Sequence, residues 1–216
     1  MLAKSRIIQL LEEGNYAELI GVSKGGRGIF RALISLSYDK ESLLCWRAIE
    51  AIGLLAGQLA KDNAAGTRSL VQRLLWMMRD ESGNNVGSAP EILGEIVRNS
   101  PEEFYDIAPI IASFHDEDGL RRGVFRALQR IAEVRPDLCR SLSSEVGKYI
   151  KSDDAYVRVF AILLARTLGL TECLPSIEEF LDDESTVRLY GEGEWHLRSV
   201  SKIAKEAVIM LQEGEK

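Results

Sequence analysis

Cysteine and histidine are scarce in this sequence, and their spacing argues against several classes of protein. Three cysteines, Cys45, Cys139 and Cys173, and two histidines, His115 and His196, are scattered over 216 residues. An odd number of widely separated cysteines without CxxC spacing argues against a disulfide framework or a zinc knuckle and favours buried free thiols. Two isolated histidines suggest neither a metal site nor a Ser-His-Asp triad. We therefore predict no metal, no cofactor and no catalytic residue.

Long apolar runs are also missing. Purely apolar stretches such as Leu74–Met78 and Ala161–Ala165 are far shorter than the ~20 residues of a membrane-spanning helix. Near the N-terminus, Lys4, Arg6 and Glu12 carry charge, and no apolar run of signal-peptide length follows them. These features predict a cytoplasmic protein without a membrane partner.

A large excess of positive charge is absent as well. The net charge is −6, and its distribution is uneven. Residues 1–80 carry eleven Lys and Arg against eight Asp and Glu, whereas residues 81–216 carry sixteen against twenty-five. Because the acidic C-terminal two-thirds repels phosphate backbones, we predict no nucleic-acid partner.

Five stretches resemble one another at intervals of roughly 35 to 42 residues. Each is rich in Ala, Leu and Ile with helical spacing, and an acidic turn precedes most of them. Self-similarity at this period is typical of a solenoid of stacked helix pairs that share one continuous core. The stretches are Cys45–Gly57, Gly87–Val97, Arg121–Glu133, Val157–Gly169 and Val200–Leu211. We therefore predict an all-α fold, an α-α superhelix.

Residues 1–216 are predicted to form one solenoid domain, with atypical capping helices at 1–38 and about four to five repeats at 39–216. Apolar periodicity and capping residues place the main helices along the repeats. Small residues such as Ala51, Gly53 and Gly94 are expected where neighbouring helices approach closely. The predicted helices are Ser42–Leu59, Arg68–Arg79, Glu102–Phe114, Leu120–Val134, Pro136–Ile150, Tyr156–Leu168, Leu174–Leu181 and Val200–Gln212.

One segment departs from helical spacing. Thr186–Leu197 alternates β-branched and aromatic residues around Gly191-Glu192-Gly193, which predicts a small β-hairpin inside the last repeat. Its aromatic residues Tyr190 and Trp195, with His196, are interpreted as a plug for the end of the solenoid, which needs a cap. The alternative is a protruding recognition element.

These stretches resemble the HEAT repeat family, specifically the phycobilisome-lyase-type HEAT-like repeats. Ser152–Gly169 matches the pattern of acidic turn, Val-Arg and Ala-rich helix best, and Trp46–Gly53 matches its helix half. Arg79–Ile96 also resembles a motif of bacterial HEAT-repeat proteins. The resemblance implies the solenoid fold. By analogy it also implies an alternative function, a lyase or chaperone-like factor for a tetrapyrrole protein. A further resemblance, to alkylpurine glycosylases, implies a basic, Trp-lined groove that the acidic C-terminal part disfavours.

The loop RDESGNNVGSAPE is the most distinctive string in the sequence. Its Gly and Asn residues suit turns with positive φ, and a polar loop before a helix N-terminus can hold an anion or a peptide carbonyl. The structural alternative is a long turn within a repeat. The candidate binding residues here are Glu81, Asn84, Asn85 and Glu91, with Trp46 as a neighbour.

Three arginines, Arg122, Arg126 and Arg130, lie four residues apart and therefore share one helix face. If this face lines the concave surface, we expect Arg126 and Arg130 to face a groove and pair with a partner's carboxylate or phosphate. The alternative is a solvated face with salt bridges to Glu91, Glu95 or Glu133.

Acidic turns such as Asp153-Asp154 and Asp182-Asp183-Glu184 recur between helices. They are predicted to cap the following helix and to pair with Arg122 or Arg158. A cation site or a contact for a basic partner is the alternative. Taken together, the features favour a non-enzymatic scaffold of the HEAT-repeat type that binds a protein or peptide.

Overall fold

The computed structural model describes residues 3–23, 27–79 and 87–214 of the chain. Helices dominate it, and one two-stranded antiparallel sheet lies near the C-terminus. The prediction of an all-α superhelix with a small hairpin is therefore confirmed. The helical elements are α1 (Lys4–Glu12), α2 (Tyr16–Ser23), α3 (Arg27–Leu36), α4 (Leu43–Met78), α5 (Ala89–Asn99), α6 (Pro101–Phe104), α7 (Ile107–Ala112), α8 (Asp118–Ala132), η1 (Pro136–Leu142), α9 (Ser143–Ile150), α10 (Ala155–Leu168), η2 (Thr171–Cys173), α11 (Leu174–Glu178) and α12 (Val200–Glu213).

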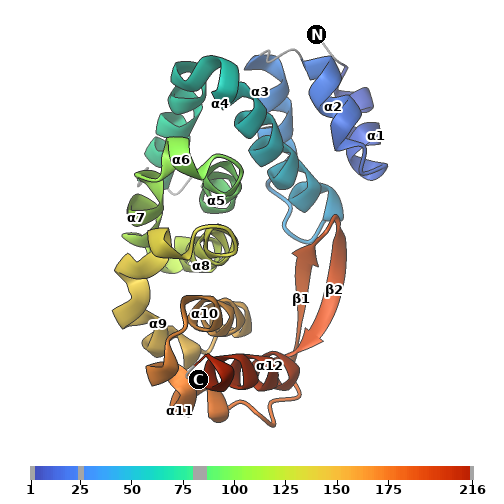
Figure 1. Ribbon diagram of the computed structural model, residues 1–216. Coiled ribbons are helices and arrows are strands. Elements are labelled where there is room, and N and C mark those ends of the chain that lie inside the picture. The colour runs from blue at the N-terminus through green and yellow to red at the C-terminus, as the bar shows by residue number, and fades with distance from the viewer. Residues whose placement is uncertain (1–2, 24–26, 80–86, 215–216) are drawn as a thin grey trace.

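The helices stack in two layers (Figure 1). The inner layer runs from the first half of α4 through α5, α8 and α10 to α12, and each helix contacts the next. Shorter helices, α6, α7, η1, α9 and α11, form the outer layer. This is the arrangement that the sequence repeats predict, because each apolar helix face is covered by its neighbours.

Several predicted helices have different boundaries in the structure; Pro136–Ile150, for example, is divided into η1 and α9. Helix α4 continues through the segment predicted to separate two helices, but it bends at Asn63, where φ is −150° and ψ is 72°. The predicted helix Glu102–Phe114 is divided into α6 and α7. Pro109 explains this division, because its ring would clash with the carbonyl of Tyr105 in a continuous helix.

Glycine permits the closest approach within the inner layer. A Cβ atom on Gly53 would lie 2.6 Å from Cβ of Glu95, and one on Gly94 would lie 2.6 Å from Cα of Ala127. Both contacts are shorter than side chains tolerate, so α4, α5 and α8 are held together at distances that only glycine allows. The predicted role of these small residues in helix packing is confirmed.

Helix α4, with 36 residues, is the longest of the described helices. Its best 18-residue window has a mean hydropathy of 1.4, so by length and composition this helix alone, within the described parts of the chain, could cross a membrane. Half of that window is buried inside the solenoid. Ala48, Ile52 and Leu55, for example, are almost fully buried in the core. Burial in the solenoid core accounts for the apolar composition of α4.

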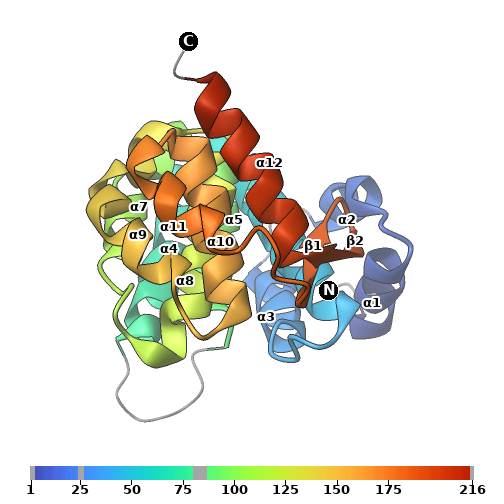
Figure 2. The ribbon, with the colours of Figure 1, turned by 90° about the horizontal axis from the view of Figure 1, so that it is seen from below.

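The hairpin consists of β1 (Thr186–Gly191) and β2 (Glu194–Ser199), with Tyr190 opposite Trp195. Positive φ angles of 52° at Glu192 and 81° at Gly193 suit a two-residue turn of type I′. The hairpin leaves the solenoid beside α12 and extends back to the beginning of α4 and to α1 (Figures 1 and 2). The prediction that its aromatic residues plug the end of the solenoid is wrong for Tyr190 and Trp195, which pack on Trp46 of α4. His196 Nε2 lies 3.0 Å from the Gly191 carbonyl, within the hairpin.

Candidate functional site beneath the hairpin

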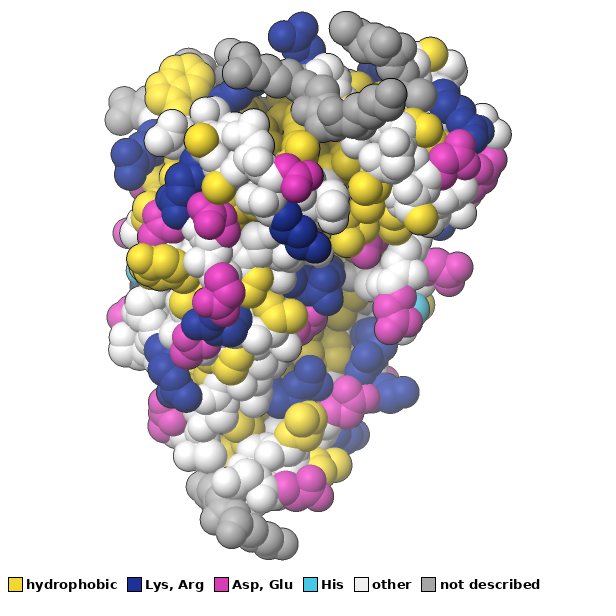
Figure 3. Space-filling model, turned by 45° about the horizontal axis from the view of Figure 1, so that its top comes forward, with side chains coloured by type: hydrophobic (Ala, Val, Ile, Leu, Met, Phe, Trp, Pro, Cys, Tyr) yellow, Lys and Arg dark blue, Asp and Glu magenta, His cyan; other side chains and the backbone are white. Residues whose placement is uncertain are grey.

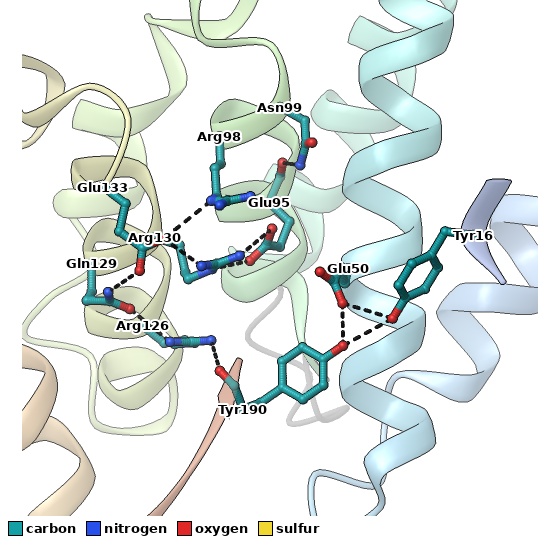
Figure 4. Close-up of polar contacts among 10 residues, drawn as sticks. All are labelled: Tyr16, Glu50, Glu95, Arg98, Asn99, Arg126, Gln129, Arg130, Glu133 and Tyr190. Carbon is teal, nitrogen blue, oxygen red and sulfur yellow. Dashed lines mark hydrogen bonds and ion pairs between the residues drawn. The ribbon is translucent and has the colours of Figure 1, made fainter. Parts of the chain in front are cut away.

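The hairpin is attached to the inner layer through both ends of Tyr190 (Figure 4). The Tyr190 hydroxyl donates a hydrogen bond to the Glu50 carboxylate, and the Tyr16 hydroxyl donates to the same carboxylate at 2.8 Å. The two hydroxyl oxygens lie 3.2 Å apart. At the other end, the Tyr190 carbonyl accepts a hydrogen bond of 2.6 Å from Arg126 Nη2. One hairpin residue thus joins α2, α4 and α8.

Burial keeps both tyrosines in the protonated form. Desolvation, together with the nearby Glu50 carboxylate, raises the pKa of Tyr190 and of Tyr16 well above the ordinary value of 10.0. Each hydroxyl therefore remains a donor to Glu50 over the whole physiological pH range.

Aromatic contacts strengthen this attachment. Trp46 stacks on Tyr190 with ring centroids 5.9 Å apart and meets Trp195 edge-on at 5.8 Å. The Trp46 indole N–H donates to the Lys40 carbonyl at 2.9 Å, which fixes the orientation of its ring. At the hairpin turn, Arg47 Nε donates to the Gly193 carbonyl at 2.9 Å. Polar and aromatic side chains from α4 therefore hold the far end of the hairpin.

The three arginines that share one face of α8, Arg122, Arg126 and Arg130, lie on its concave side, but their environments differ. Arg122 is half-exposed and pairs with Asp154 at 2.8 Å. Arg130 is largely buried and pairs with Glu95 at 2.6 Å and with Glu133 at 2.5 Å. The salt-bridge alternative of the sequence analysis therefore describes Arg130.

Arg126 is buried beneath the hairpin, with only 7% of its surface exposed. Desolvation lowers the pKa of its guanidinium to about 10, and the neighbouring positive charge of Arg130 acts in the same direction. The side chain is still protonated at neutral pH. Arg126 lines a small cavity, and Tyr190 of β1 lies against its guanidinium.

Glu91 lies in the same region, at the start of α5. Its Oε1 atom pairs with Lys40 Nζ at 2.5 Å, and the residue is 3% exposed. Its Oε2 atom is buried without a hydrogen-bond partner among the described residues and packs against Gly123. Glu81, Asn84 and Asn85, the other candidates from the distinctive loop, lie outside the described residues.

A cavity of about 40 Å³ lies between the hairpin and the inner layer. It brings together four of the predicted binding residues, Trp46, Glu91, Arg122 and Arg126, which come from three helices. Arg130 lines a neighbouring cavity beneath Tyr190. The remaining residues around the first cavity are Lys40, Glu41, Tyr156, Phe160, Arg188, Leu189, Tyr190 and Trp195.

Sequence reasoning missed Tyr16 and Glu50, and it placed Tyr190 at the wrong end of the molecule. Tyr16 and Tyr190 are separated by 174 positions, and Glu50 and Tyr190 by 140. Neither residue pair belongs to a local motif. The one available signal was Glu50 itself, the single charged residue in the stretch Ala48–Gly57.

None of the three cysteines lines this cavity. All three are buried, and burial raises the pKa of Cys45 and of Cys139 to about 12. Thiols with such pKa values carry almost no thiolate at neutral pH and are poor nucleophiles. Within the described residues, no three His, Cys, Asp or Glu side chains gather as a metal site would require.

Loss of the Tyr190 hydroxyl provides a direct test of the attachment. We expect Tyr190→Phe to lower the free energy of unfolding by about 1–2 kcal/mol, because the half-buried Glu50 carboxylate loses one of its two tyrosine donors. Amide hydrogen exchange in β1 and β2 should become faster. Tyr105→Phe is the matched control, since Tyr105 is 58% exposed. Equal stability and exchange in both variants would contradict the attachment.

Comparisons with known proteins show a helical repeat fold but do not assign the chain to a family. No family model matches the chain. An uncharacterized protein of Archaeoglobus fulgidus is 28% identical over 179 residues, covering 81% of this chain and 92% of that protein. Among solved structures, an engineered protein is similar with a TM-score of 0.55 and 15% identity, over 99% of this chain and 98% of that one. A designed armadillo repeat protein in complex with the peptide (KR)4 has a TM-score of 0.53 and 16% identity, over 95% of this chain and 98% of that one. The chain is therefore similar to helical repeat solenoids.

Proposed function

We propose that this protein is a non-enzymatic scaffold that binds a protein or peptide partner at the concave face around the hairpin. The observation that carries the proposal is the concentration of Trp46, Arg122 and Arg126 around one cavity on that face. Tryptophan and arginine are the residues that most often dominate binding energy at interfaces. The likeness to a designed repeat protein that holds a peptide supports a partner of the same kind.

The charge pattern supports a protein partner over a phosphate backbone. On the face that Figure 3 shows, positive and negative side chains lie interspersed. Such a mixture suits a partner with complementary charges of both signs, whereas nucleic-acid binding requires an extended basic surface.

Affinity capture tests this proposal. The full-length protein, immobilised, should retain the same partner from native lysate in repeated mass-spectrometric experiments. Arg122→Glu should abolish that capture, because it reverses a half-exposed charge at the cavity. Arg140→Glu, on the exposed surface of η1 in the outer layer, is the matched control and should capture normally. Equal capture by the two variants, or no reproducible partner, would count against the proposal.

The family resemblance suggests a second test. If the repeats are of the phycobilisome-lyase type, a tetrapyrrole should bind and change its absorbance spectrum. The cavity beneath the hairpin is too small for such a ligand, because pockets for small molecules usually span about 300–1,000 Å³. A cavity of about 590 Å³ between α3 and α4 is large enough. No spectral change and no thermal shift with a tetrapyrrole would exclude this alternative.

A further inference from the structure

The cavity beneath the hairpin carries more positive than negative groups. Four cations line it: Arg122 and Arg126 from α8, Arg188 from β1, and Lys40 from the turn before α4. Only two carboxylates, Glu41 and Glu91, are among the lining residues. Glu41 is already paired with Arg188 at 2.7 Å and Glu91 with Lys40 at 2.5 Å. Among the described residues, neither carboxylate makes an ion pair or a hydrogen bond with the two α8 arginines.

Arg126 is the buried cation of this cavity, and it has no carboxylate in direct contact among the described residues. Its two hydrogen bonds go to neutral oxygens, Gln129 Oε1 at 2.8 Å and the Tyr190 carbonyl at 2.6 Å. The nearby acid Glu95 is engaged by Arg130 instead. Buried charges in proteins are normally paired, because desolvating a lone ion is costly. A guanidinium has five N–H donors, so Arg126 can accommodate a further acceptor.

Aromatic rings hold the arginine groups in place around the cavity. The Arg126 guanidinium lies 5.5 Å from the Phe160 ring centroid and 5.9 Å from that of Trp46. Arg122 lies 4.4 Å from the Tyr156 ring, and Arg188 lies 4.5 Å from the Trp195 ring. These rings exclude water on one side of each cation, which strengthens its attraction for an anion.

The size of the cavity limits what can enter. A volume of about 40 Å³ has room for about three water molecules, at roughly 10–15 Å³ each. That is the size of a single carboxylate or phosphoryl group and far less than that of a nucleoside or a sugar. Arg122 is 52% exposed and its partner Asp154 is 35% exposed, so this pair is weak and an entering anion can replace Asp154.

We propose that this cavity is a site for one oxyanionic group, a carboxylate or phosphoryl group, held by Arg122, Arg126 and Arg188 and carried on an acidic side chain of the partner. The statement that a partner protein carries the oxyanionic group rests on the proposed function, whereas the anion site itself does not. Arginine suits this role because its planar donors match the oxygens of carboxylate and phosphate groups.

Thermal unfolding in the presence of inorganic phosphate tests the site. For a dissociation constant of about 1 mM, 50 mM phosphate should raise the melting temperature of the full-length protein by about 5 °C over sodium chloride of equal ionic strength. Acetate should give a smaller shift in the same direction. Both Arg122→Gln and Arg188→Gln should remove at least half of the phosphate shift. Arg140→Gln, on the exposed surface of η1, should retain all of it.

Each outcome of this experiment is decisive. A shift that persists unchanged in Arg122→Gln and Arg188→Gln would overturn the proposal, as would the absence of any shift beyond sodium chloride. A phosphate shift that depends on the two arginines without any captured partner would support the anion site and count against the scaffold function. A captured partner whose binding survives Arg122→Gln and Arg188→Gln, and is insensitive to 50 mM phosphate, would support the scaffold function and count against the anion site.

Discussion

Replacing Arg126 by glutamate should lower the free energy of unfolding by about 3–5 kcal/mol, the range for leaving an uncompensated charge in a protein interior. The substitution removes the donors to Gln129 and to the Tyr190 carbonyl. It also places a carboxylate in a site with 7% exposure, near Glu95 and Glu91. Thermal and denaturant unfolding of the full-length protein would measure the loss.

Two variants separate the causes of this effect. Arg126→Met keeps the apolar stem without a charge, so it should cost only about 1–2 kcal/mol through the lost hydrogen bonds. Arg122→Glu lies one turn earlier, where the side chain is half-exposed, and should cost less than about 1 kcal/mol. If Arg126→Glu proves as stable as wild type, the hairpin does not cover Arg126 in solution.

Gly94→Ala should also be strongly destabilising, by about 3 kcal/mol. The new Cβ atom would lie 2.6 Å from Cα and 2.7 Å from Cβ of Ala127, so α5 and α8 must move apart. Overpacking of this kind usually costs about 1–3 kcal/mol, and contact with a backbone atom places this site at the upper end. The expected fall in melting temperature is about 6–12 °C for a chain of this length.

Gly147→Ala is the matched control for this substitution. Gly147 lies inside α9, and a Cβ atom there would meet Cys173 Sγ at 3.7 Å, an ordinary contact. Because alanine is the better helix former, Gly147→Ala should be neutral or stabilise the protein by up to about 1 kcal/mol. Similar melting temperatures for the two alanine variants would show that the α5–α8 contact is not as close as described.

Local features of the chain were predictable because local forces produce them. Asp154 caps α10 through the backbone N–H groups of Tyr156 and Val157 and also pairs with Arg122, as its place in an acidic turn indicates. The hairpin followed from alternation and a turn with two residues of positive φ. Both depend on residues close together in sequence.

The candidate site was predictable only in part. Spacing placed Arg122, Arg126 and Arg130 on one helix face, but it carried no information about what covers that face. The covering residue, Tyr190, is 64 positions from Arg126, and its hydrogen-bond partners Glu50 and Tyr16 are further away in the sequence. Which side of the solenoid the hairpin occupies depends on the summed curvature of all the repeats, and no single motif encodes that curvature.

The contact between Tyr16 and Tyr190 has a consequence for how the chain folds. In an open solenoid each repeat touches only its neighbours, so the ends can fray independently and folding can begin anywhere. Here residues 174 positions apart are joined. Closing so long a loop costs chain entropy, and its contacts form only when the intervening repeats have already set the distance. We therefore expect the hairpin to dock late in folding. Once the hairpin has joined the two ends of the solenoid, the whole molecule should unfold as one cooperative unit.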